Sequence, residues 1–324
     1  METSSSSYLL SLIIPVYNNG IYLKEVCFNS LKKSTIFSNI EIIIVDDGST
    51  DSTTVTIIND LSRQYDNIIT YFFPSGGSGT ASRARNYGIR LSTSQYVSYL
   101  DPDNEAINDG YYKLYLAIKD SEYDMVMGNI VVNNGFGSFK LNYYNKFMLS
   151  NHRKDTCSDG RQLLLSSNFS ANSIQATIFR RQLIIDNTLA MADGAIGQDT
   201  IFFYSTVLCA KHIKAINELV HIYYNKNATS VTNTINPAYF TKRYLNEKYK
   251  LSILSQYNLL QDYYETKQDS YFKSYIFNKL RLLSYKDLYQ ARGIVSDIYE
   301  LYDHQWHIKD LEMKRYFKQE DDWS

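Results

Sequence analysis

The chain has 324 residues, a formal net charge of −1 at pH 7 and a pI of about 6.5, so it is long enough for a sizeable core and one or two domains. The nearly balanced charge excludes the broad basic surface of a nucleic-acid-binding protein, and we expect no nucleic-acid partner. No apolar run approaches the roughly 20 residues that span a bilayer, so we expect at most a peripheral contact with the inner face of a membrane.

The cysteines and the first residues indicate the compartment. Cys27, Cys157 and Cys209 are odd in number and widely spaced, which fits neither a disulfide framework nor a zinc site. The first seven residues are not basic, which argues against a signal peptide. These features predict a reduced, cytoplasmic setting.

Strand-like and helical segments alternate over the first hundred residues. Apolar runs predict strands at 8–16, 40–45, 68–73 and 96–100. Helical spacing predicts helices at 21–34, 51–65 and 82–91, the second of them opened by the capping residue Asp51. This order predicts an α/β fold with a mostly parallel central sheet between helices.

The pattern is less regular beyond residue 100. A helix is predicted at 110–119, a strand at 124–132, and one or two strands at 213–224. Residues 133–160 are rich in Asn, Gly and Ser, so we expect an irregular, mobile loop over the site. From residue 237 the apolar residues recur at helical spacing without a strand signal. We therefore expect a catalytic domain at 1–236 and an appended helical module at 237–324.

Two predicted strands stop abruptly at paired carboxylates, Asp46-Asp47 and Asp101-Pro102-Asp103. In an open α/β sheet, ligands bind beyond the carboxyl ends of the strands, so both clusters can share one site. The first could accept a hydrogen bond from a base or ribose. The second could hold Mn²⁺ or Mg²⁺ on a diphosphate, although Asp is also an ordinary turn former. The pair favours an enzyme that uses a nucleotide sugar.

Four further positions have both a functional and a structural interpretation. Gly79 lies in the Gly-rich stretch 74–80, which is either a ligand-binding loop or a flexible turn. Arg85 could present its planar fork to a base or phosphate, or be a surface charge on a helix. Asp199, at the start of an apolar helix, is a candidate general base or a cap. His221, in an apolar strand, is a candidate metal ligand or a core histidine.

Four segments resemble, in order and spacing, the hallmark motifs of family 2 glycosyltransferases. They are Ile13-Ile-Pro-Val-Tyr-Asn18, Val45-Asp-Asp-Gly-Ser-Thr-Asp51, Ala84-Arg-Asn-Tyr-Gly88 and Leu100-Asp-Pro-Asp103. The resemblance covers about residues 8–230 and ends in a Tyr-rich stretch from Tyr223 to Ser230. It implies a single domain of the type A nucleotide-binding fold, a UDP-sugar donor, a divalent metal and inversion at the anomeric carbon.

The resemblance also implies roles for individual residues. The expected nucleotide-binding residues are Pro15, Tyr17, Asn18, Asp46, Gly48, Ser49, Gly79, Arg85, Asp101 and Pro102. The expected metal ligands are Asp101, Asp103 and His221, and Asp199 is the expected catalytic base. The chain departs from the family at Gln198 and Asn104, where relatives often carry additional acids.

These observations predict an inverting hexosyltransferase that moves a sugar, with UDP-Gal or UDP-Glc favoured, to a hydroxyl of a glycan or glycoprotein. The cation would neutralise the leaving UDP while Asp199 deprotonates the acceptor. The alternatives are a sugar nucleotidyltransferase and a non-catalytic, glycosyltransferase-like partner subunit. The Tyr-rich helical module resembles those of streptococcal and lactobacillar enzymes that build capsule or glycosylate Ser-rich adhesins. We expect this module to serve the acceptor, with simple packing as the alternative.

Overall fold

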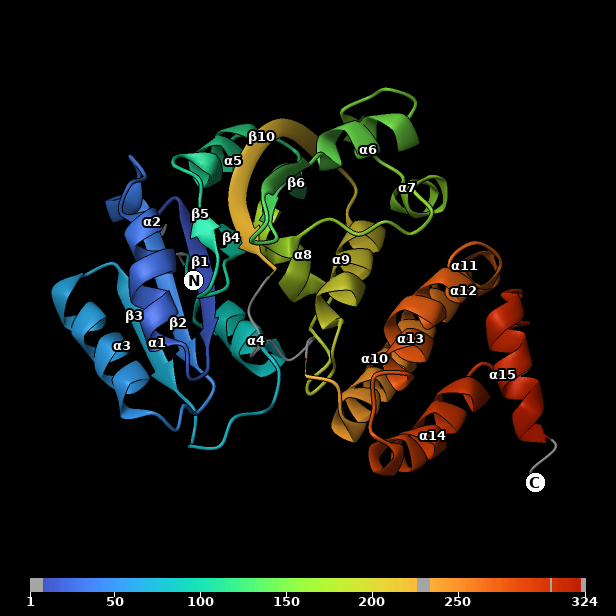
Figure 1. Ribbon diagram of the computed structural model, residues 1–324. Coiled ribbons are helices and arrows are strands. Elements are labelled where there is room, and N and C mark those ends of the chain that lie inside the picture. The colour runs from blue at the N-terminus through green and yellow to red at the C-terminus, as the bar shows by residue number, and fades with distance from the viewer. Residues whose placement is uncertain (1–7, 226–233, 304, 322–324) are drawn as a thin grey trace. The chain divides into compact units, whose positions relative to one another are not determined.

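The computed structural model describes residues 8–225, 234–303 and 305–321 (Figure 1). Ser230, at the end of the Tyr-rich stretch, therefore lies outside the described residues. The chain forms two compact units. The sheet unit comprises Met1–Ser167, Ala171–Gly194 and Gln198–Asn227, and the helical unit comprises Asn168–Ser170, Ala195–Gly197 and Ala228–Ser324.

One ten-stranded sheet organises the described part of the sheet unit, in the order β3-β2-β1-β4-β9-β6-β10-β5, with β7 on β6 and β8 on β10. The strands are β1 Leu10–Val16, β2 Ile40–Asp46, β3 Ile68–Phe72, β4 Tyr96–Tyr99, β5 Glu105–Ala106, β6 Met125–Asn133, β7 Ser138–Leu141, β8 Thr156–Cys157, β9 Thr177–Arg180 and β10 Ile213–Tyr224. The ladders from β3 to β4 and the ladder between β6 and β10 are parallel, whereas β5, β7, β8 and β9 pair antiparallel. The predicted mostly parallel α/β sheet is confirmed.

Helices connect the strands and cover both faces of the sheet. The first connection is one continuous helical stretch made of α1 Gly20–Tyr22, the π-helical η1 Leu23–Phe28 and α2 Asn29–Leu31. The others in this unit are η2 Phe37–Asn39, α3 Ser52–Gln64, α4 Ser82–Leu91, α5 Gly110–Ile118, α6 Tyr143–Ser150, α7 Gly160–Ser166, η3 Ile174–Ala176, α8 Arg181–Asp186 and α9 Gln198–Cys209. As predicted, Asp51 caps α3 by accepting a hydrogen bond from the amide of Thr54 at 2.7 Å.

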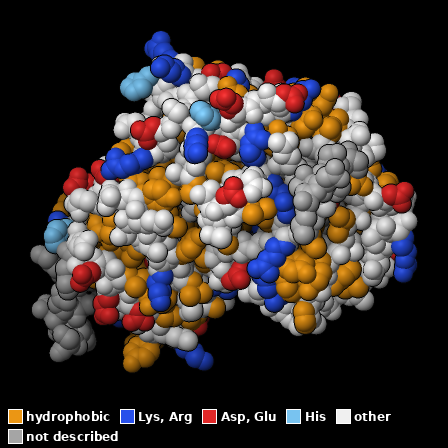
Figure 2. All heavy atoms as spheres, turned by 180° about the vertical axis from the view of Figure 1, so that it is seen from behind, with side chains coloured by type: hydrophobic (Ala, Val, Ile, Leu, Met, Phe, Trp, Pro, Cys, Tyr) orange, Lys and Arg blue, Asp and Glu red, His pale blue; other side chains and the backbone are white. Residues whose placement is uncertain are grey.

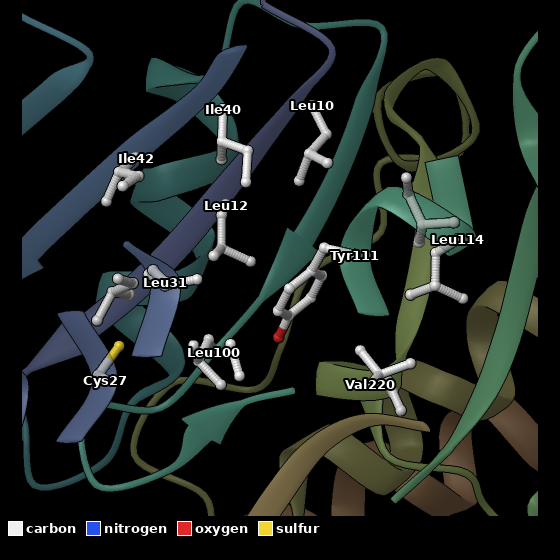
Figure 3. Packing of buried hydrophobic residues seen from close by; sticks show 14 of the residues in the cluster. Leu10, Leu12, Cys27, Leu31, Ile40, Ile42, Leu100, Tyr111, Leu114 and Val220 are labelled. Atoms are coloured by element: carbon white, nitrogen blue, oxygen red, sulfur yellow. The ribbon is translucent and has the colours of Figure 1, made fainter. Parts of the chain in front are cut away.

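The main core lies on one face of the sheet, where alternate strand residues meet the first helical stretch, α3 and α5. Figure 3 shows Leu12, Ile42 and Leu31 on one side of this cluster and Tyr111 and Val220 on the other, all of them buried. Because side chains alternate across a strand, the neighbouring residues of β1 point to the opposite face. There α4 packs closely, since a Cβ atom at Gly88 would lie 2.4 Å from Cγ2 of Ile13.

The prediction of an irregular loop at 133–160 is wrong. This stretch contains β7, α6 and β8, and β7 forms a hairpin with β6. Asn142, one of the Asn residues in this stretch, caps α6 by accepting from the amide of Asn145. Asn129, in β6, accepts from the amide of Tyr144. A composition rich in Asn, Gly and Ser therefore did not reveal the short elements of this stretch.

The helical unit contains the predicted C-terminal helices, and its described residues include no strand. They are α10 Pro237–Gln256, α11 Leu260–Thr266, α12 Gln268–Phe272, η4 Lys273–Phe277, α13 Asn278–Leu280, α14 Tyr285–Glu300 and α15 Leu311–Asp321. Its core includes a fully buried ion pair between Lys250 and Glu247 at 2.6 Å, and the ammonium lies 3.9 Å from the ring centre of Tyr271. Many tyrosines here pack against buried polar groups, which explains the Tyr-rich texture.

On the face shown in Figure 2, positive and negative side chains are interspersed. None of the described helices has the length and apolar character to cross a bilayer. All three cysteines are free thiols.

Candidate active site

The two carboxylate clusters do lie at the same edge of the sheet. Strands β2, β1 and β4 are neighbours and parallel, with Val16 paired to Asp46 and Ile13 paired to Tyr99. The turns that follow these strands therefore leave the sheet side by side, at the edge where α/β proteins bind ligands. Pro15 fits here because β1 pairs with β4 only up to Ile13, so the missing amide of proline lies beyond that ladder.

Asp46 is the last residue of β2 and is 2 % exposed. Its carboxylate accepts hydrogen bonds from the amide and hydroxyl of Ser49. Burial raises the pKa of Asp46, although these hydrogen bonds act in the opposite direction. Gly48 has φ +87°, and a Cβ atom there would lie 2.1 Å from the carbonyl oxygen of Pro74, so no larger residue fits this turn.

The turn after β1 is tied to the turn after β2. The side-chain oxygen of Asn18 accepts from the amide of Thr50 at 2.8 Å, and the amide of Asn18 donates to the hydroxyl of Ser49 at 2.8 Å. Asn18 therefore connects the two turns, in addition to its expected contact with the nucleotide. Tyr17 is 41 % exposed and covers Gly77, where a Cβ atom would lie 2.6 Å from its ring. An exposed ring over a glycine turn is a suitable surface for stacking a base.

The Gly-rich stretch 74–80 is held in place rather than free. The carboxylate of Asp47 accepts from the amide and hydroxyl of Ser78 at 2.6 and 2.7 Å, and it forms an ion pair with Arg83 at 2.8 Å. Arg83 in turn lies 4.2 Å from the ring centre of Phe73. Gly79 adopts φ +84° in this loop. These contacts favour the interpretation as an ordered ligand-binding loop over that of a flexible turn.

Arg85 is not a surface charge. It is 5 % exposed, and its Nη2 donates to the carboxylate of Asp101 at 2.5 Å. Burial alone would lower the pKa of Arg85, but Asp101 and then Asp199 outweigh it, so the pKa is raised and the guanidinium stays charged. Its Nε has no hydrogen-bond partner among the described residues. A buried cation with an unused donor is suited to bind an anionic ligand.

The Asp-x-Asp turn is built on a glutamine from another part of the chain. Gln175 in η3 accepts from the amide of Asp101 and from the side-chain amide of Asn104, each at 2.9 Å, and donates to the carboxylate of Asp101 at 2.9 Å. Asn104 is fully buried and also accepts from the amide of Tyr224. The asparagine that replaces the family's third acid is therefore structural. Pro102 is buried in this turn, and Asp103 is partly exposed.

His221 is buried in β10, and its Nε2 lies 3.1 Å from the hydroxyl of Ser173. Burial lowers the pKa of His221 to about 4, although the backbone of Ile222 and the charge of Asp101 act in the opposite direction. Its Nδ1 forms no hydrogen bond of normal geometry with any described residue. A neutral imidazole with a free nitrogen is able to ligate a metal.

The expected metal ligands do not form a closed cage. Within residues 8–225, 234–303 and 305–321, no three His, Cys, Asp or Glu side chains lie together as a metal-binding group. The expected trio of Asp101, Asp103 and His221 is therefore not assembled, and Asp101 is already engaged by Arg85 and Gln175. Mg²⁺ and similar hard cations, however, commonly bind through one or two carboxylates plus the substrate's phosphates. The donors present fit that arrangement.

Asp199 is the second residue of α9 and is exposed. The first turn of a helix stabilises an ionised carboxylate, which is the form that a base requires. Its charge raises the pKa of both Arg85 and Tyr143, so it shares an electrostatic environment with the Arg85–Asp101 pair. Asp193, in the preceding turn, is contacted by the amide of Asn86 at 3.2 Å.

The sequence did not reveal several residues that organise this site. Gln175 and Ser173 precede β9, and Asn86 binds the backbone of Met191 in both directions at 2.8 Å. Asn86 belongs to a recognised motif, so its position offered a signal. Gln175 offered none, because a glutamine between apolar residues looks like any half-buried polar residue until the fold brings it to Asp101.

The comparisons with known proteins agree on one family. A family model described as glycosyl transferase family 2 matches residues 11–187. The glycosyltransferase GlyG of Streptococcus pneumoniae is 36 % identical over 123 residues, which cover 38 % of this chain and 39 % of that protein. The minor teichoic acid biosynthesis protein GgaA of Bacillus subtilis is 26 % identical over 328 residues, covering 96 % of this chain and 70 % of that protein. Some matched segments span a small share of the relative, such as 39 % of GlyG and 16 % of GgaB.

Two solved structures share the fold. Residues 1–349 of S. aureus TarS, in complex with UDP-GlcNAc, superpose with a TM-score of 0.67 at 19 % identity, covering 89 % of this chain and 80 % of that one. The mannosyltransferase PcManGT of Pyrobaculum calidifontis, in complex with GDP-Man and Mn²⁺, gives a TM-score of 0.52 at 10 % identity, covering 94 % of this chain and 84 % of that one. At these identities the likeness concerns the fold alone.

Proposed function

Because the chain belongs to glycosyl transferase family 2, we propose that this glycosyltransferase moves a hexose or N-acetylhexosamine from a UDP-sugar to a hydroxyl of a cell-surface glycan, with inversion. The observation that carries the proposal is the buried Arg85–Asp101 pair, with its unused guanidinium donor, at the edge of the sheet where Asp46 ends β2. The similarity to GgaA, which covers 96 % of this chain and 70 % of that protein, favours a wall-type glycan as acceptor, and a glycoprotein acceptor is the alternative. Because the TarS structure is a complex with UDP-GlcNAc, UDP-GlcNAc is a candidate donor in addition to UDP-Gal and UDP-Glc.

In this proposal the donor nucleotide lies across the turns after β1 and β2. Tyr17, over Gly77, would stack on the uracil, and Asp46 would accept a hydrogen bond from the base, since its oxygens keep lone pairs beyond those used by Ser49. Arg85 would bind the diphosphate through Nε, the donor that lacks a protein partner among the described residues. A divalent cation, with Mn²⁺ favoured, would be held by Asp103 with His221 or Asp101 and would neutralise the diphosphate charge.

Asp199 would then carry out the proton transfer. The acceptor oxygen attacks the anomeric carbon, its proton passes to the Asp199 carboxylate, and the bond from that carbon to the phosphate oxygen breaks to release UDP. The exposed position of Asp199 leaves it accessible to an acceptor. Its location in the first turn of α9 favours the ionised state before the reaction.

The test is a screen with UDP-Glc, UDP-Gal, UDP-GlcNAc and UDP-GalNAc that measures UDP release and binding. Asp199→Asn should reduce transfer by about 10²- to 10⁴-fold, the usual effect of losing a general base, and leave UDP affinity unchanged. Asp193→Asn, in the turn before α9, is the matched control and should retain transfer. Pyrophosphate formation from UTP and a sugar 1-phosphate would establish the nucleotidyltransferase alternative. UDP binding without turnover of any donor would favour the non-catalytic subunit.

We also propose a cytoplasmic location, with peripheral contact at the membrane where wall glycans are assembled. The free thiols are in line with a reducing compartment. Fractionation of cells that express the tagged protein tests this location.

A further inference from the structure

The buried side chain of Gln175 forms three hydrogen bonds with the Asp-x-Asp turn. It lies in the 3₁₀ helix η3, just before β9, and is 8 % exposed. Its oxygen accepts from the amide of Asp101 and from the side chain of Asn104, and its nitrogen donates to the carboxylate of Asp101. One side chain thus fixes both the backbone and the carboxylate of the same residue.

The partners determine which way the amide of Gln175 faces. A backbone N–H can only donate, so the oxygen must face the amide of Asp101. A carboxylate can only accept, so the nitrogen must face Oδ2 of Asp101. A glutamate here would place a second anion against Asp101, and a methionine would leave the buried amide groups unpaired. The position therefore requires an amide for its chemistry as well as its size.

The backbone of Gln175 is also fixed. The hydroxyl of Tyr111 lies 3.0 Å from its carbonyl oxygen, and its own amide donates to the hydroxyl of Ser173 at 3.3 Å. Burial raises the pKa of Tyr111 well above its usual range, so the phenol keeps its proton as a donor. Tyr111 thus holds the backbone of Gln175, and its hydroxyl also lies 2.9 Å from the carbonyl oxygen of Tyr99, two residues before Asp101.

Asp101 links this clamp to Arg85. Its Oδ1 accepts from Nη2 of Arg85 and its Oδ2 accepts from Gln175, so the carboxylate is held between a cation and a neutral amide. The guanidinium also contacts the sulfur of Met191, which lies 4.0 Å from its Nη1. The direction of Arg85 consequently depends on where Gln175 holds Asp101.

We infer that Gln175 is a positioning residue, which acts through Asp101 to aim the Arg85 guanidinium at the diphosphate of the donor. The inference rests on the proposed function, since it needs a nucleoside diphosphate as the ligand of Arg85. It goes further by assigning the orientation of that arginine to a residue in η3, 74 residues away from Asp101 in the sequence. Partners that orient a ligand-binding group are typically worth about 10- to 100-fold in affinity or activity.

The experiment is a double-mutant cycle on UDP affinity, followed by ligand-observed NMR, which registers millimolar binding. Gln175→Met should weaken UDP binding by about 10- to 100-fold in the wild-type background. In the Arg85→Met background the same change should cost less than about threefold, because the group that Gln175 aims is already gone. Ser98→Ala is the matched control: Ser98 is fully buried and donates to the carbonyl of Thr177, but it does not contact the clamp. Its effect on UDP affinity should be negligible in both backgrounds.

The outcomes separate the inference from the proposed function. If wild-type protein binds no UDP, the proposed function fails. If it binds UDP but Gln175→Met has the same affinity, or has equal effects in both backgrounds, Gln175 is only a packing residue and the inference is overturned. If Gln175→Met does not fold, Gln175→Asn keeps the neutral amide but is one methylene shorter, so it cannot make the same contacts with Asp101. That variant should show the same dependence on Arg85, and its absence overturns the inference equally.

Discussion

Replacing Arg243 should show what the helical unit contributes to the reaction. Arg243 lies in α10 and is 4 % exposed. It donates to the hydroxyl of Tyr239 at 3.0 Å and to the carbonyl of Ile196 at 3.3 Å. The amide of Ile196 also donates to the carbonyl of Lys242 at 3.3 Å. The short segment Ala195–Gly197 is thus attached to α10, and it is followed two residues later by Asp199.

The structure sets the expected cost of Arg243→Met. The change removes two charge-assisted hydrogen bonds and the contacts with the rings of Tyr239 and Tyr275 at 5.1 and 4.7 Å. The removal of a buried charge and the apolar burial of methionine offset part of the loss. We expect the free energy of unfolding to fall by about 2–4 kcal/mol. Burial alone would lower the pKa of Arg243, but Tyr271 and Tyr239 outweigh it and raise the pKa, so the charge is present at every working pH.

The expected effect of Arg243→Met on transfer comes from the turn at Gly197 and not from the loss of folding stability. Gly197 has φ +89°, and a Cβ atom there would lie 2.8 Å from Nη1 of Arg243, so the turn and the arginine fit closely. If the turn relaxes, the start of α9 and Asp199 shift with it, and a displacement of about 1 Å can cost about 10²-fold in rate. Arg243→Met should therefore lower kcat for transfer by about 10-fold or more while UDP affinity changes less than about twofold.

The control is Lys250→Met in the same helix. It breaks the buried pair with Glu247 at 2.6 Å, at a cost of about 3–5 kcal/mol, without touching Ala195–Gly197. Unfolding is followed by circular dichroism, and rates are measured well below both melting temperatures. Equal losses of kcat in the two variants would refute the reasoning, because the effect would then track stability alone. Deleting 237–324 is a poorer test, since it removes every partner of the turn in the helical unit at once.

Two further predictions concern the metal and the pH dependence. EDTA should abolish transfer and Mn²⁺ restore it, and Asp103→Ala should lose metal-dependent UDP binding while it stays folded; full activity in EDTA would exclude the metal role. Because burial lowers the pKa of His221 to about 4 from 6.5, the unfolded state binds the extra proton first. In EDTA, stability should be full above about pH 6.5 and fall by about 3 kcal/mol as the pH drops to 4, with a shallower slope in His221→Asn. Identical slopes in urea titrations of the two proteins would contradict the buried, neutral histidine.

The local pattern of the sequence was sufficient to predict the regular helices and strands of the sheet unit. The predicted helix at 82–91 coincides with α4, and the first four strands are within two residues of the predicted ends. These segments are long or strongly periodic, and period and capping are local properties of the chain. The short elements between 133 and 160 were not predicted, because their stability comes from pairing with β6 and from caps. A count of residue types does not reveal such contacts.

The site, too, has features that the sequence predicts and features that only the tertiary structure shows. The sequence by itself determined which residues end the strands, and therefore that Asp46 and Asp101 share an edge, since parallel strands present the same ends together. Only the tertiary structure decided that Arg85 is buried against Asp101, that Gln175 clamps that carboxylate, and that Arg243 holds the turn before Asp199. Each of these contacts joins residues that are distant in sequence, and burial gives a side chain its partner, its charge state and its direction. No local pattern contains that information, because it arises only when the sheet and the helices have packed.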